Sequence, residues 1–150
     1  MSILVIQDNK KARFDYEILE VIEAGIVLTG SEVKSLRDKN IQLKDSYVSF
    51  SNGEAFLQNA HISPYQASSY NNHVPERLRK LLLNRKEINQ LMGKVQERGL
   101  SIVPLKIFFK KGLVKLDLGL VRGKKVHDKR QSIKERESSK SLKQTLRHSR

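Results

Sequence analysis

Residues 100–121 read "LSIVPLKIFFKKGLVKLDLGLV", and this stretch decides the class of fold. Two apolar runs flank the polar triplet KKG at residues 110–112, and both runs are rich in leucine, β-branched residues or phenylalanine. Strand-forming runs separated by a few residues that include glycine are typical of an antiparallel hairpin. The stretch therefore predicts two strands joined by a tight turn at Gly112, in a mostly β protein.

Residues 15–33, DYEILEVIEAGIVLTGSEV, hold the first strand signals of the chain. Their β-branched residues are interrupted by glycine, which predicts two short strands around a kink or bulge at residues 23–25. Residues 31–40 follow, and Ser31 is a candidate helix cap because its hydroxyl can accept a backbone N–H bond. A helix of one or two turns is therefore expected after these strands.

A second hairpin is predicted within residues 45–65. The tetrapeptide SNGE at residues 51–54 lies between the apolar runs 47–50 and 55–57. Asn-Gly favours a hairpin turn because both residues tolerate positive φ. The polar residues 66–74 have no periodicity, and we expect them to form a loop.

One longer helix is predicted at residues 84–99, NRKEINQLMGKVQERG. Asn84 suits the N-cap of that helix, and Gly99 suits its C-terminal end. Between them, apolar residues recur at helical spacing: Ile88, Leu91, Met92 and Val95. The preceding residues 77–83, RLRKLLL, fit either a first helical turn or an extended segment.

Together these signals predict five or six short strands, one short helix and one longer helix. The connections are hairpin-like, so the sheet should be mostly antiparallel, and a small closed or nearly closed barrel leaves few exposed edges. An OB-like barrel over residues 1–121 fits best, although other small β-barrels would produce nearly the same pattern. Residues 122–150 would form a separate basic tail.

The charge of the chain indicates a polyanionic partner. The net charge is +13 over 150 residues, as in proteins that bind nucleic acid. Residues 122–150 contribute +8, from 11 Lys and Arg against 3 Asp and Glu. This tail has too few apolar residues to bury a core, so we expect it to be disordered when free.

Composition excludes several classes of protein. The chain has no cysteine, which rules out a disulfide framework, a thiolate metal site and a Cys nucleophile. The first residues do not match a secretory signal, and no stretch approaches the roughly 18 apolar residues of a membrane span. The expectation is a soluble cytoplasmic protein that needs no cofactor or metal and does not bind membranes.

Binding chemistry is better represented than catalytic chemistry. The four histidines have no metal-ligand spacing, and Walker, nucleophile-elbow and dinucleotide motifs are absent. Lys and Arg stand beside apolar residues in four basic runs, at residues 9–14, 32–39, 77–86 and 122–130. Such side chains neutralise phosphates, and without a DNA-reading motif they favour structured or single-stranded RNA.

A series of segments resembles, in the same order, the family of SsrA-binding proteins (SmpB). The segments are NKKARFDYEI, EAGIVLTGSEVKSLRDKN, DSYV, GEAFLQNAHISPY, PERLRKLLLNRKEI, LMGKV, VPLKIFF, GLVRGKKVHDKR and IKERE. The resemblance covers roughly residues 9–137, and its most specific parts are GSEVKSLR, RKLLLN and RGKKVHDKR.

The resemblance implies an OB-type barrel that binds the tRNA-like domain of transfer-messenger RNA (tmRNA, or SsrA), as a monomer with one copy per RNA. In that family the complex enters the A site of stalled ribosomes with elongation factor Tu, which is a partner only through the RNA. The protein stands in for the missing anticodon arm, and trans-translation then adds a degradation tag. The family's tail is disordered when free and becomes helical in the empty mRNA channel, which it senses.

The resemblance also implies individual site residues. The RNA-binding positions for the tRNA-like domain are Glu23, Leu82, Asn84, Asn9, Lys10, Lys11, Lys34 and Arg37. The positions for the decoding centre and mRNA channel of the ribosome are Gly123, Lys124, Lys125, His127, Asp128, Lys129, Arg130, Lys134 and Arg136. His127 matches a position that stacks on a ribosomal RNA base.

Structural roles remain open for some of these residues. Leu82 could instead be a core residue. Asn84 could be a helix cap, although a cap needs only the side-chain oxygen and could coexist with an RNA contact. A carboxylate on an RNA-binding surface is explained if Glu23 accepts hydrogen bonds from base edges or 2′-hydroxyls, or orients a nearby Lys or Arg.

Two other classes of function compete with an adaptor. An RNA-processing enzyme such as a nuclease could use the tail as a tether, but it would need clustered acids or histidines to activate water or hold Mg²⁺. A structural ribosomal protein would also be small and basic.

Overall fold

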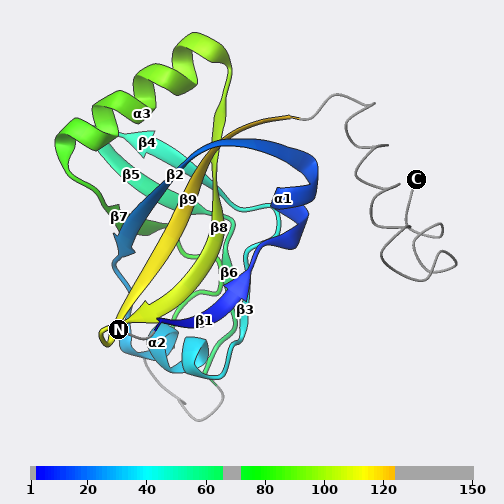
Figure 1. Cartoon of the computed structure of the whole chain (residues 1–150). Helices are drawn as coiled ribbons and strands as arrows, with labels where there is room; N and C mark the ends of the chain where they lie inside the picture. Colours follow the sequence, from blue (N-terminus) through cyan, green and yellow to red (C-terminus); the bar gives the residue numbers. More distant parts are fainter. Residues whose placement is uncertain (1–2, 66–71, 124–150) are drawn as a thin grey trace, which may run out of the picture.

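The computed structural model describes residues 3–65 and 72–123 (Figure 1). Within these residues the chain forms nine strands and three helices. In chain order they are β1 (Ile3–Asp8), α1 (Lys10–Asp15), β2 (Tyr16–Ile26), α2 (Gly30–Arg37), β3 (Ile41–Gln42), β4 (Tyr47–Ser51), β5 (Glu54–Gln58), β6 (His61–Ile62), β7 (Arg79–Leu82), α3 (Arg85–Arg98), β8 (Ser101–Lys110) and β9 (Leu113–Gly123).

The predicted hairpin of residues 100–121 is confirmed as β8 and β9. Lys110 pairs with Leu113, and the two residues between them, Lys111 and Gly112, have φ of 53° and 77°. Two successive residues with positive φ form the type I′ turn, whose twist matches that of the flanking strands. The hairpin lies inside the sheet rather than at its edge, because β8 also pairs with β1 and β9 with β2.

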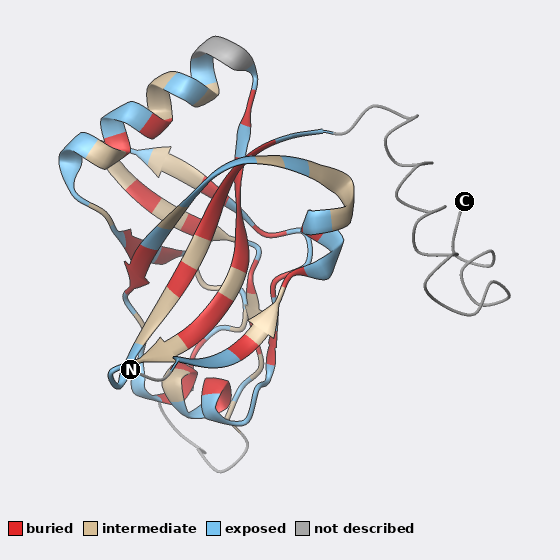
Figure 2. Ribbon diagram, in the orientation of Figure 1, coloured by how far each residue is buried: buried red, intermediate tan, exposed pale blue. Residues whose placement is uncertain are grey.

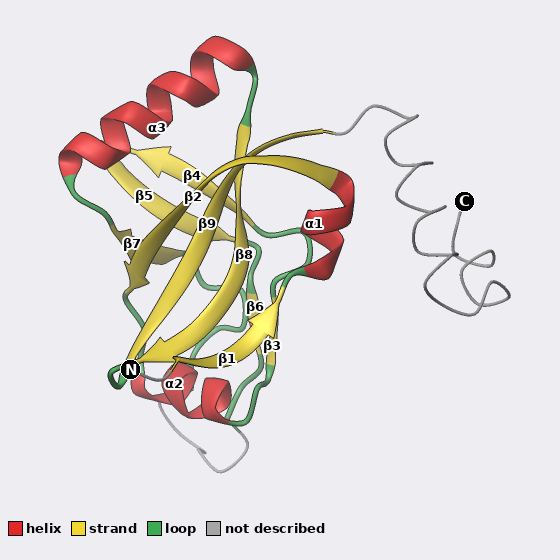
Figure 3. Cartoon of the chain, viewed as in Figure 1, coloured by secondary structure: helices red, strands yellow, loops and turns green. Residues whose placement is uncertain are grey.

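One curled sheet forms the body of the protein. Seven strands pair in the order β1-β8-β9-β2-β7-β5-β4, and the described pairs are all antiparallel. The last strand, β4, also lies close to β8, so the sheet curls into a nearly closed barrel (Figure 3). The predicted mostly β, antiparallel barrel is therefore confirmed. The short strands β3 and β6 pair separately.

Alternate side chains of the curled sheet fill its interior. Leu57, Leu81, Leu116 and Leu118 are each at most 1% exposed, and they belong to one apolar cluster. Figure 2 shows buried positions as red segments along the strands. Burial of a leucine side chain contributes about 1.5–3 kcal/mol, so this cluster is the main source of stability.

The helices cover different parts of the barrel. Helix α3 lies at one end beside β4 and β5, and α2 lies at the other end (Figure 1). Ile88 and Leu91 of α3 and Leu36 of α2 extend the main cluster. Helix α1 packs outside β8 and β9, where its Ala12 joins a second cluster that includes Leu105.

Local signals in the sequence were accurate for the second hairpin and for α3. Asn52 and Gly53 have φ of 53° and 76° between β4 and β5. Asn84 is the N-cap of α3, and Gly99 ends that helix with φ of 63°. The ambiguous segment 77–83 contains strand β7, so it is extended rather than helical.

Three predictions about the first half of the chain were wrong. Residues 16–26 form a single strand, and its register shift lies between Ile18 and Glu20 rather than at residues 23–25. The N-cap of α2 is Thr29, not Ser31, because Thr29 forms a capping box with Glu32. Strand β1 and helix α1 were not predicted, so the described helices number three rather than two.

The predicted boundary at residue 121 lies close to the end of the described chain. Strand β9 continues to Gly123, and residues 124–150 of the predicted tail lie outside the described residues. The division into barrel and tail therefore stays a prediction. In the part of the chain that the structure describes, no helix is long and apolar enough to cross a bilayer.

Candidate RNA-binding surface

Glu23 and Leu82 lie on the same outer face of the barrel. They come from the neighbouring strands β2 and β7, where Gly25 is the pairing partner of Leu82. Because side chains alternate across a strand, Glu23, Gly25 and Leu82 share one face. Glu23 is exposed, and the Leu82 side chain is 55% exposed. Leu82 is therefore a surface residue and not part of the core.

The Leu82 side chain lies against Gly25. A Cβ atom on residue 25 would lie 3.2 Å from Leu82 Cδ1 and 3.3 Å from Leu82 Cβ, closer than carbon atoms normally approach. The missing side chain of Gly25 thus allows Leu82 to lie over β2. The kink or bulge predicted at residues 23–25 is not found at Gly25, because its pairing partners Leu82 and Lys115 are in regular register.

The Glu23 carboxylate has a basic neighbour. Lys110 Nζ of β8 donates to Glu23 Oε1 at 3.1 Å, and the two side chains are 35% and 40% exposed. Glu23 Oε2 accepts no hydrogen bond from the residues that the structure describes. On β9, the adjacent Asp117 pairs with Lys106 at 3.5 Å. This face can therefore accept hydrogen bonds from a ligand while lysines offset its negative charge.

Asn84 caps α3 and is also exposed. Its Oδ1 accepts a hydrogen bond from the Glu87 N–H at 2.8 Å, and the Asn84 N–H donates to Glu87 Oε1 at 3.1 Å. Its Nδ2 donates to no group among residues 3–65 and 72–123. The cap leaves this donor available to a ligand, so the two roles are compatible.

The predicted basic positions lie on two separate helices. Lys10 and Lys11 are exposed on α1, and Lys34 and Arg37 are exposed on α2. Lys34 Nζ lies 5.7 Å from the centre of a tyrosine ring, at Tyr65. These four cations are therefore not gathered into one cluster with Glu23.

Asn9 holds α1 against the barrel. It is 5% exposed, its Oδ1 accepts from the Ala12 N–H at 3.2 Å, and its Nδ2 donates to the Pro104 carbonyl at 2.8 Å. The Asn9 N–H donates to the Leu105 carbonyl at 2.8 Å. These bonds give Asn9 a structural role, and its RNA contact stays a prediction without support from this geometry.

A buried ion-pair network was missed by the sequence reasoning. Glu32 of α2 and Arg79 of β7 are both 0% exposed. Arg79 Nε donates to Glu32 Oε2 at 2.6 Å, and Arg77 Nη2 donates to Glu32 Oε1 at 2.7 Å. The other Arg79 nitrogens donate to the carbonyls of Ala60 and Pro75. Two cations of the basic run 77–86, Arg77 and Arg79, therefore support the fold, and the buried Arg79 is not available to RNA.

Glu32 is held in its charged form. Burial by itself raises the pKa of this carboxyl, but hydrogen bonds from Arg77, the Thr29 N–H and Arg79 outweigh burial and lower the pKa to about 2. Burial lowers the pKa of Arg79, and Glu32 opposes that effect. A general acid or base works best with a pKa near the operating pH, so this network has a structural character.

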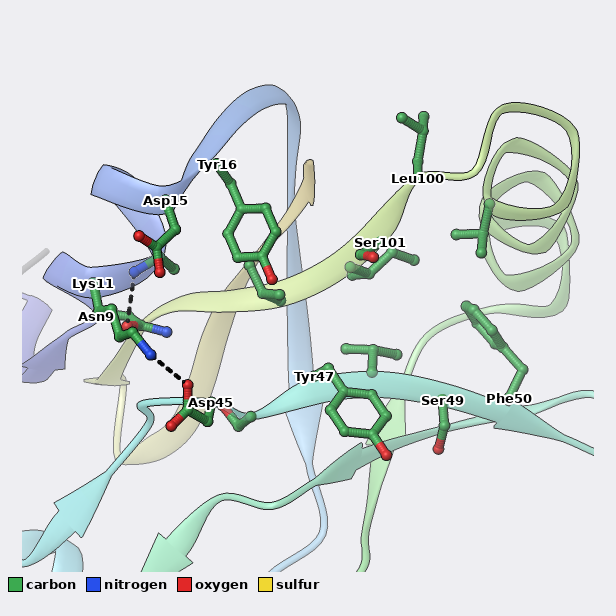
Figure 4. Close-up of a pocket in the computed structure, with 16 residues that line it drawn as sticks. Asn9, Lys11, Asp15, Tyr16, Asp45, Tyr47, Ser49, Phe50, Leu100 and Ser101 are labelled. Atoms are coloured by element: carbon green, nitrogen blue, oxygen red, sulfur yellow. Dashed lines mark hydrogen bonds and ion pairs between the residues drawn. The ribbon is translucent and has the colours of Figure 1, made fainter. Parts of the chain in front are cut away.

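A cavity of about 480 Å³ opens between α1, β4 and the start of β8 (Figure 4). Tyr16 and Tyr47 line it, and Lys11 Nζ contacts Asp45 Oδ1 at 2.7 Å on its rim. Of the predicted RNA-binding residues, Lys11 and Asn9 line this cavity. Within the described ranges, no three His, Asp or Glu side chains gather in a way that could hold a metal ion.

Of the predicted decoding-centre residues, the structure describes Gly123. It ends β9 opposite Tyr16 and is exposed, so the described chain ends beside the cavity. The others lie outside the described residues: Lys124, Lys125, His127, Asp128, Lys129, Arg130, Lys134 and Arg136.

Relatives match this chain over most of its length. The SsrA-binding protein of Bdellovibrio bacteriovorus is 60% identical over 149 residues, which cover 99% of this chain and 98% of the relative. The SsrA-binding protein of Syntrophobacter fumaroxidans is 59% identical over 92% of this chain and 86% of its own. The SsrA-binding protein of Gloeothece citriformis is 56% identical over 95% of this chain and 92% of its own.

The fold has a solved counterpart. A chain in the structure described as "tmRNA-SmpB: a journey to the center of the bacterial ribosome" is 51% identical, with a TM-score of 0.68 over 80% of this chain and 85% of that chain. The model of the SmpB protein family matches residues 6–148. In sequence and in fold, this chain belongs to the SmpB family.

Proposed function

We propose that this chain is an RNA-binding adaptor that binds the tRNA-like domain of tmRNA and delivers it to the A site of stalled ribosomes for trans-translation. The observation that carries the proposal is that Glu23 and Leu82 lie on one exposed face, with Asn84 two residues after the end of β7. These are the positions at which the family resemblance expects RNA. Membership of the SmpB family supports the same partner.

The three side chains offer complementary contacts to a folded RNA. Glu23 Oε2, which accepts no hydrogen bond from the described residues, can accept hydrogen bonds from base edges or from 2′-hydroxyls, and DNA lacks the latter. Leu82 offers apolar contact to a base or ribose, and the Asn84 amide can donate to a phosphate or sugar oxygen. Together these three side chains do not present the paired donor and acceptor that would identify one particular base. The surface therefore recognises the shape of the RNA rather than its sequence. The adaptor performs no catalysis in this scheme.

The basic tail acts after the barrel has bound the RNA. With a net charge of +8 in residues 122–150, it suits a channel of ribosomal RNA phosphates that is free of message. His127 stacks on a ribosomal RNA base, and the basic residues 124–136 contact the decoding centre and the channel wall. The protein works in the cytoplasm as a monomer, one copy per RNA, and meets elongation factor Tu only through the RNA.

Sequencing the RNA that co-purifies with the intact protein tests the proposal. One dominant tRNA-like species, recovered together with ribosomes, is the expected result. Cleavage of tmRNA by the pure protein in Mg²⁺ would favour a nuclease. Stoichiometric presence of the protein in subunits that are not stalled would favour a structural ribosomal protein. Either outcome would contradict the adaptor.

Deleting residues 131–150 tests the division between barrel and tail. The truncated protein should bind tmRNA within a few fold of the full chain, since the barrel holds the RNA. Tagging on stalled ribosomes should be abolished because the channel is no longer sensed. Loss of RNA binding in a filter assay would overturn this division of labour.

A further inference from the structure

A groove of about 400 Å³ adjoins Leu82, between β7, the turn that joins β4 to β5, and the first turn of α3. Its lining includes Gly53, Glu54, Lys80, Leu82, Leu83 and Arg85. Glu23 and Asn84 do not line it, so it is additional to the contacts proposed above. Leu82 belongs to both regions, because its side chain covers Gly25 and also lines the groove. The groove therefore continues the proposed RNA-binding face.

The lining of the groove is partly apolar. Leu82 is 55% exposed, whereas Ile88, which also lines the groove, is 5% exposed; Leu83 is intermediate. Along β7, Lys80 and Leu82 take the two outward positions. An apolar surface of this kind suits the face of a base or a ribose, since such contact needs no specific hydrogen bond.

Arg85 gives the groove an available positive charge. It is exposed, and it forms no ion pair with any residue that the structure describes. Lys80, the other cation in the lining, is paired with Glu54 at 2.5 Å. Arg85 also lies in the first turn of α3, where a positive charge interacts unfavourably with the helix dipole. The guanidinium therefore has no charged partner among the described residues, and an RNA phosphate would supply one.

We propose that this groove holds one further nucleotide of the bound RNA, adjacent to the nucleotide at Glu23. Its base or ribose lies against Leu82 and Leu83, and its phosphate accepts paired hydrogen bonds from Arg85. The inference rests on the proposed function and extends its RNA-binding face from β2 across β7 to the β4–β5 turn. Neither contact depends on the identity of the base. The groove therefore increases affinity and fixes the position of the RNA on the protein.

Arg85→Ala tests the groove, with Lys86→Ala as a matched control. Lys86 is the next residue of the same helical turn, is exposed, forms no ion pair with the described residues and does not line the groove. Both substitutions remove one positive charge from the same end of α3, so their thermal unfolding should agree. Affinity for a transcript of the tRNA-like domain is then measured over a series of salt concentrations.

Arg85→Ala should weaken binding about fivefold near 0.15 M salt and reduce the slope of log K against log salt by about 0.7–0.9, the value for one phosphate contact. Its hydroxyl-radical footprint should lose one protected nucleotide. Lys86→Ala should stay within about twofold, with an unchanged slope and footprint.

Equal losses in the two variants, or no loss in Arg85→Ala, would overturn the groove while the proposed function stands. If the unaltered protein does not bind the transcript, the proposed function falls, and the groove proposal falls with it. Whether the unaltered protein binds the transcript therefore distinguishes failure of the groove proposal from failure of the proposed function.

Discussion

Glu32 and Glu23 both contact basic side chains, but one lies inside the protein and the other on its surface. Glu32 is 0% exposed and receives hydrogen bonds from Arg79 and Arg77 at 2.6 and 2.7 Å. Glu23 is 40% exposed and receives one from Lys110 at 3.1 Å. The same functional group therefore serves the fold at one position and is available to a partner at the other.

Burial explains the difference. A buried carboxylate has lost its hydration, so the protein must satisfy both of its oxygens, as Arg77, Arg79 and the Thr29 N–H do for Glu32. An exposed pair such as Glu23 and Lys110 contributes about 0–1 kcal/mol, because water replaces either partner readily. A surface ion pair can thus exchange its partner for RNA at little cost, whereas the buried one cannot.

Replacing Glu32 with Gln should have the largest effect on the protein. The change leaves the buried Arg79 without its counter-ion, and breaking a buried pair lowers the free energy of unfolding by about 3–5 kcal/mol. Urea unfolding at neutral pH measures this loss. Glu23→Gln is the matched control and should lower stability by about 0–1 kcal/mol. Similar losses in the two variants would remove the distinction between the sites.

Acid should act on the same buried network. The pKa of Glu32 is lowered from 4.5 to about 2 in the folded protein, so the folded state binds this proton more weakly than the unfolded state. Its stabilisation is complete above pH 4.5 and is lost as the pH falls towards 2. At 1.36 kcal/mol per pH unit, the loss is about 3 kcal/mol.

Urea unfolding between neutral and acidic pH measures this dependence. The acid-dependent loss of stability should be smaller in Glu32→Gln than in the unaltered protein, because the amide has no proton to gain. Identical pH profiles for the two proteins would show that another group controls acid stability.

Glu23→Ala should weaken binding of the tRNA-like domain by about 1–3 kcal/mol, the range for a lost hydrogen bond to a charged group. Stability should change by less than about 1 kcal/mol, because the ion pair is exposed. Glu20→Ala is a close control: Glu20 is also on β2 and pairs with Lys94 at 2.7 Å. An unchanged dissociation constant for Glu23→Ala at fixed salt would refute the proposed role of this carboxylate.

Alanine substitutions at Gly119 and Gly25 provide a comparison in which each change adds a single methyl group. A Cβ atom on Gly119 would lie 2.8 Å from the Cδ1 atom of the buried Leu105, so Gly119→Ala should lower stability by about 1–3 kcal/mol through overpacking. Gly25→Ala meets the exposed Leu82 instead, and should change stability by about 0.5 kcal/mol or less.

RNA affinity should respond to the two glycine variants in the opposite order. Gly25→Ala should weaken RNA binding, though less than Glu23→Ala, because Leu82 must shift by a few tenths of an ångström. Gly119→Ala should leave the affinity of the folded protein unchanged. An RNA affinity unaffected by Gly25→Ala would mean that the position of Leu82 over β2 is unimportant for binding.

The two hairpin turns and the cap of α3 were predictable from the sequence because their chemistry is local, whereas the cap of α2 was placed two residues too late. Asn52-Gly53 and Lys111-Gly112 adopt positive φ in hairpin turns, and Asn84 forms its cap with a residue in the same helical turn. The missed elements show the limit of this reasoning. Helix α1 has six residues, and its start depends on the bonds that Asn9 makes to β8 and the β3–β4 connection.

The sequence by itself determined a mostly β barrel with two tight hairpins, a capped helix, a strongly basic tail and membership of one family. Only the tertiary structure decided that Glu32 is structural, that Asn9 is buried and that Leu82 is exposed beside Glu23. Glu32 and Arg79 are 47 residues apart in the chain, and no pattern of neighbours pairs them. Local chemistry acts within one turn, whereas burial and long-range partners exist only once the sheet has curled and brought distant strands together.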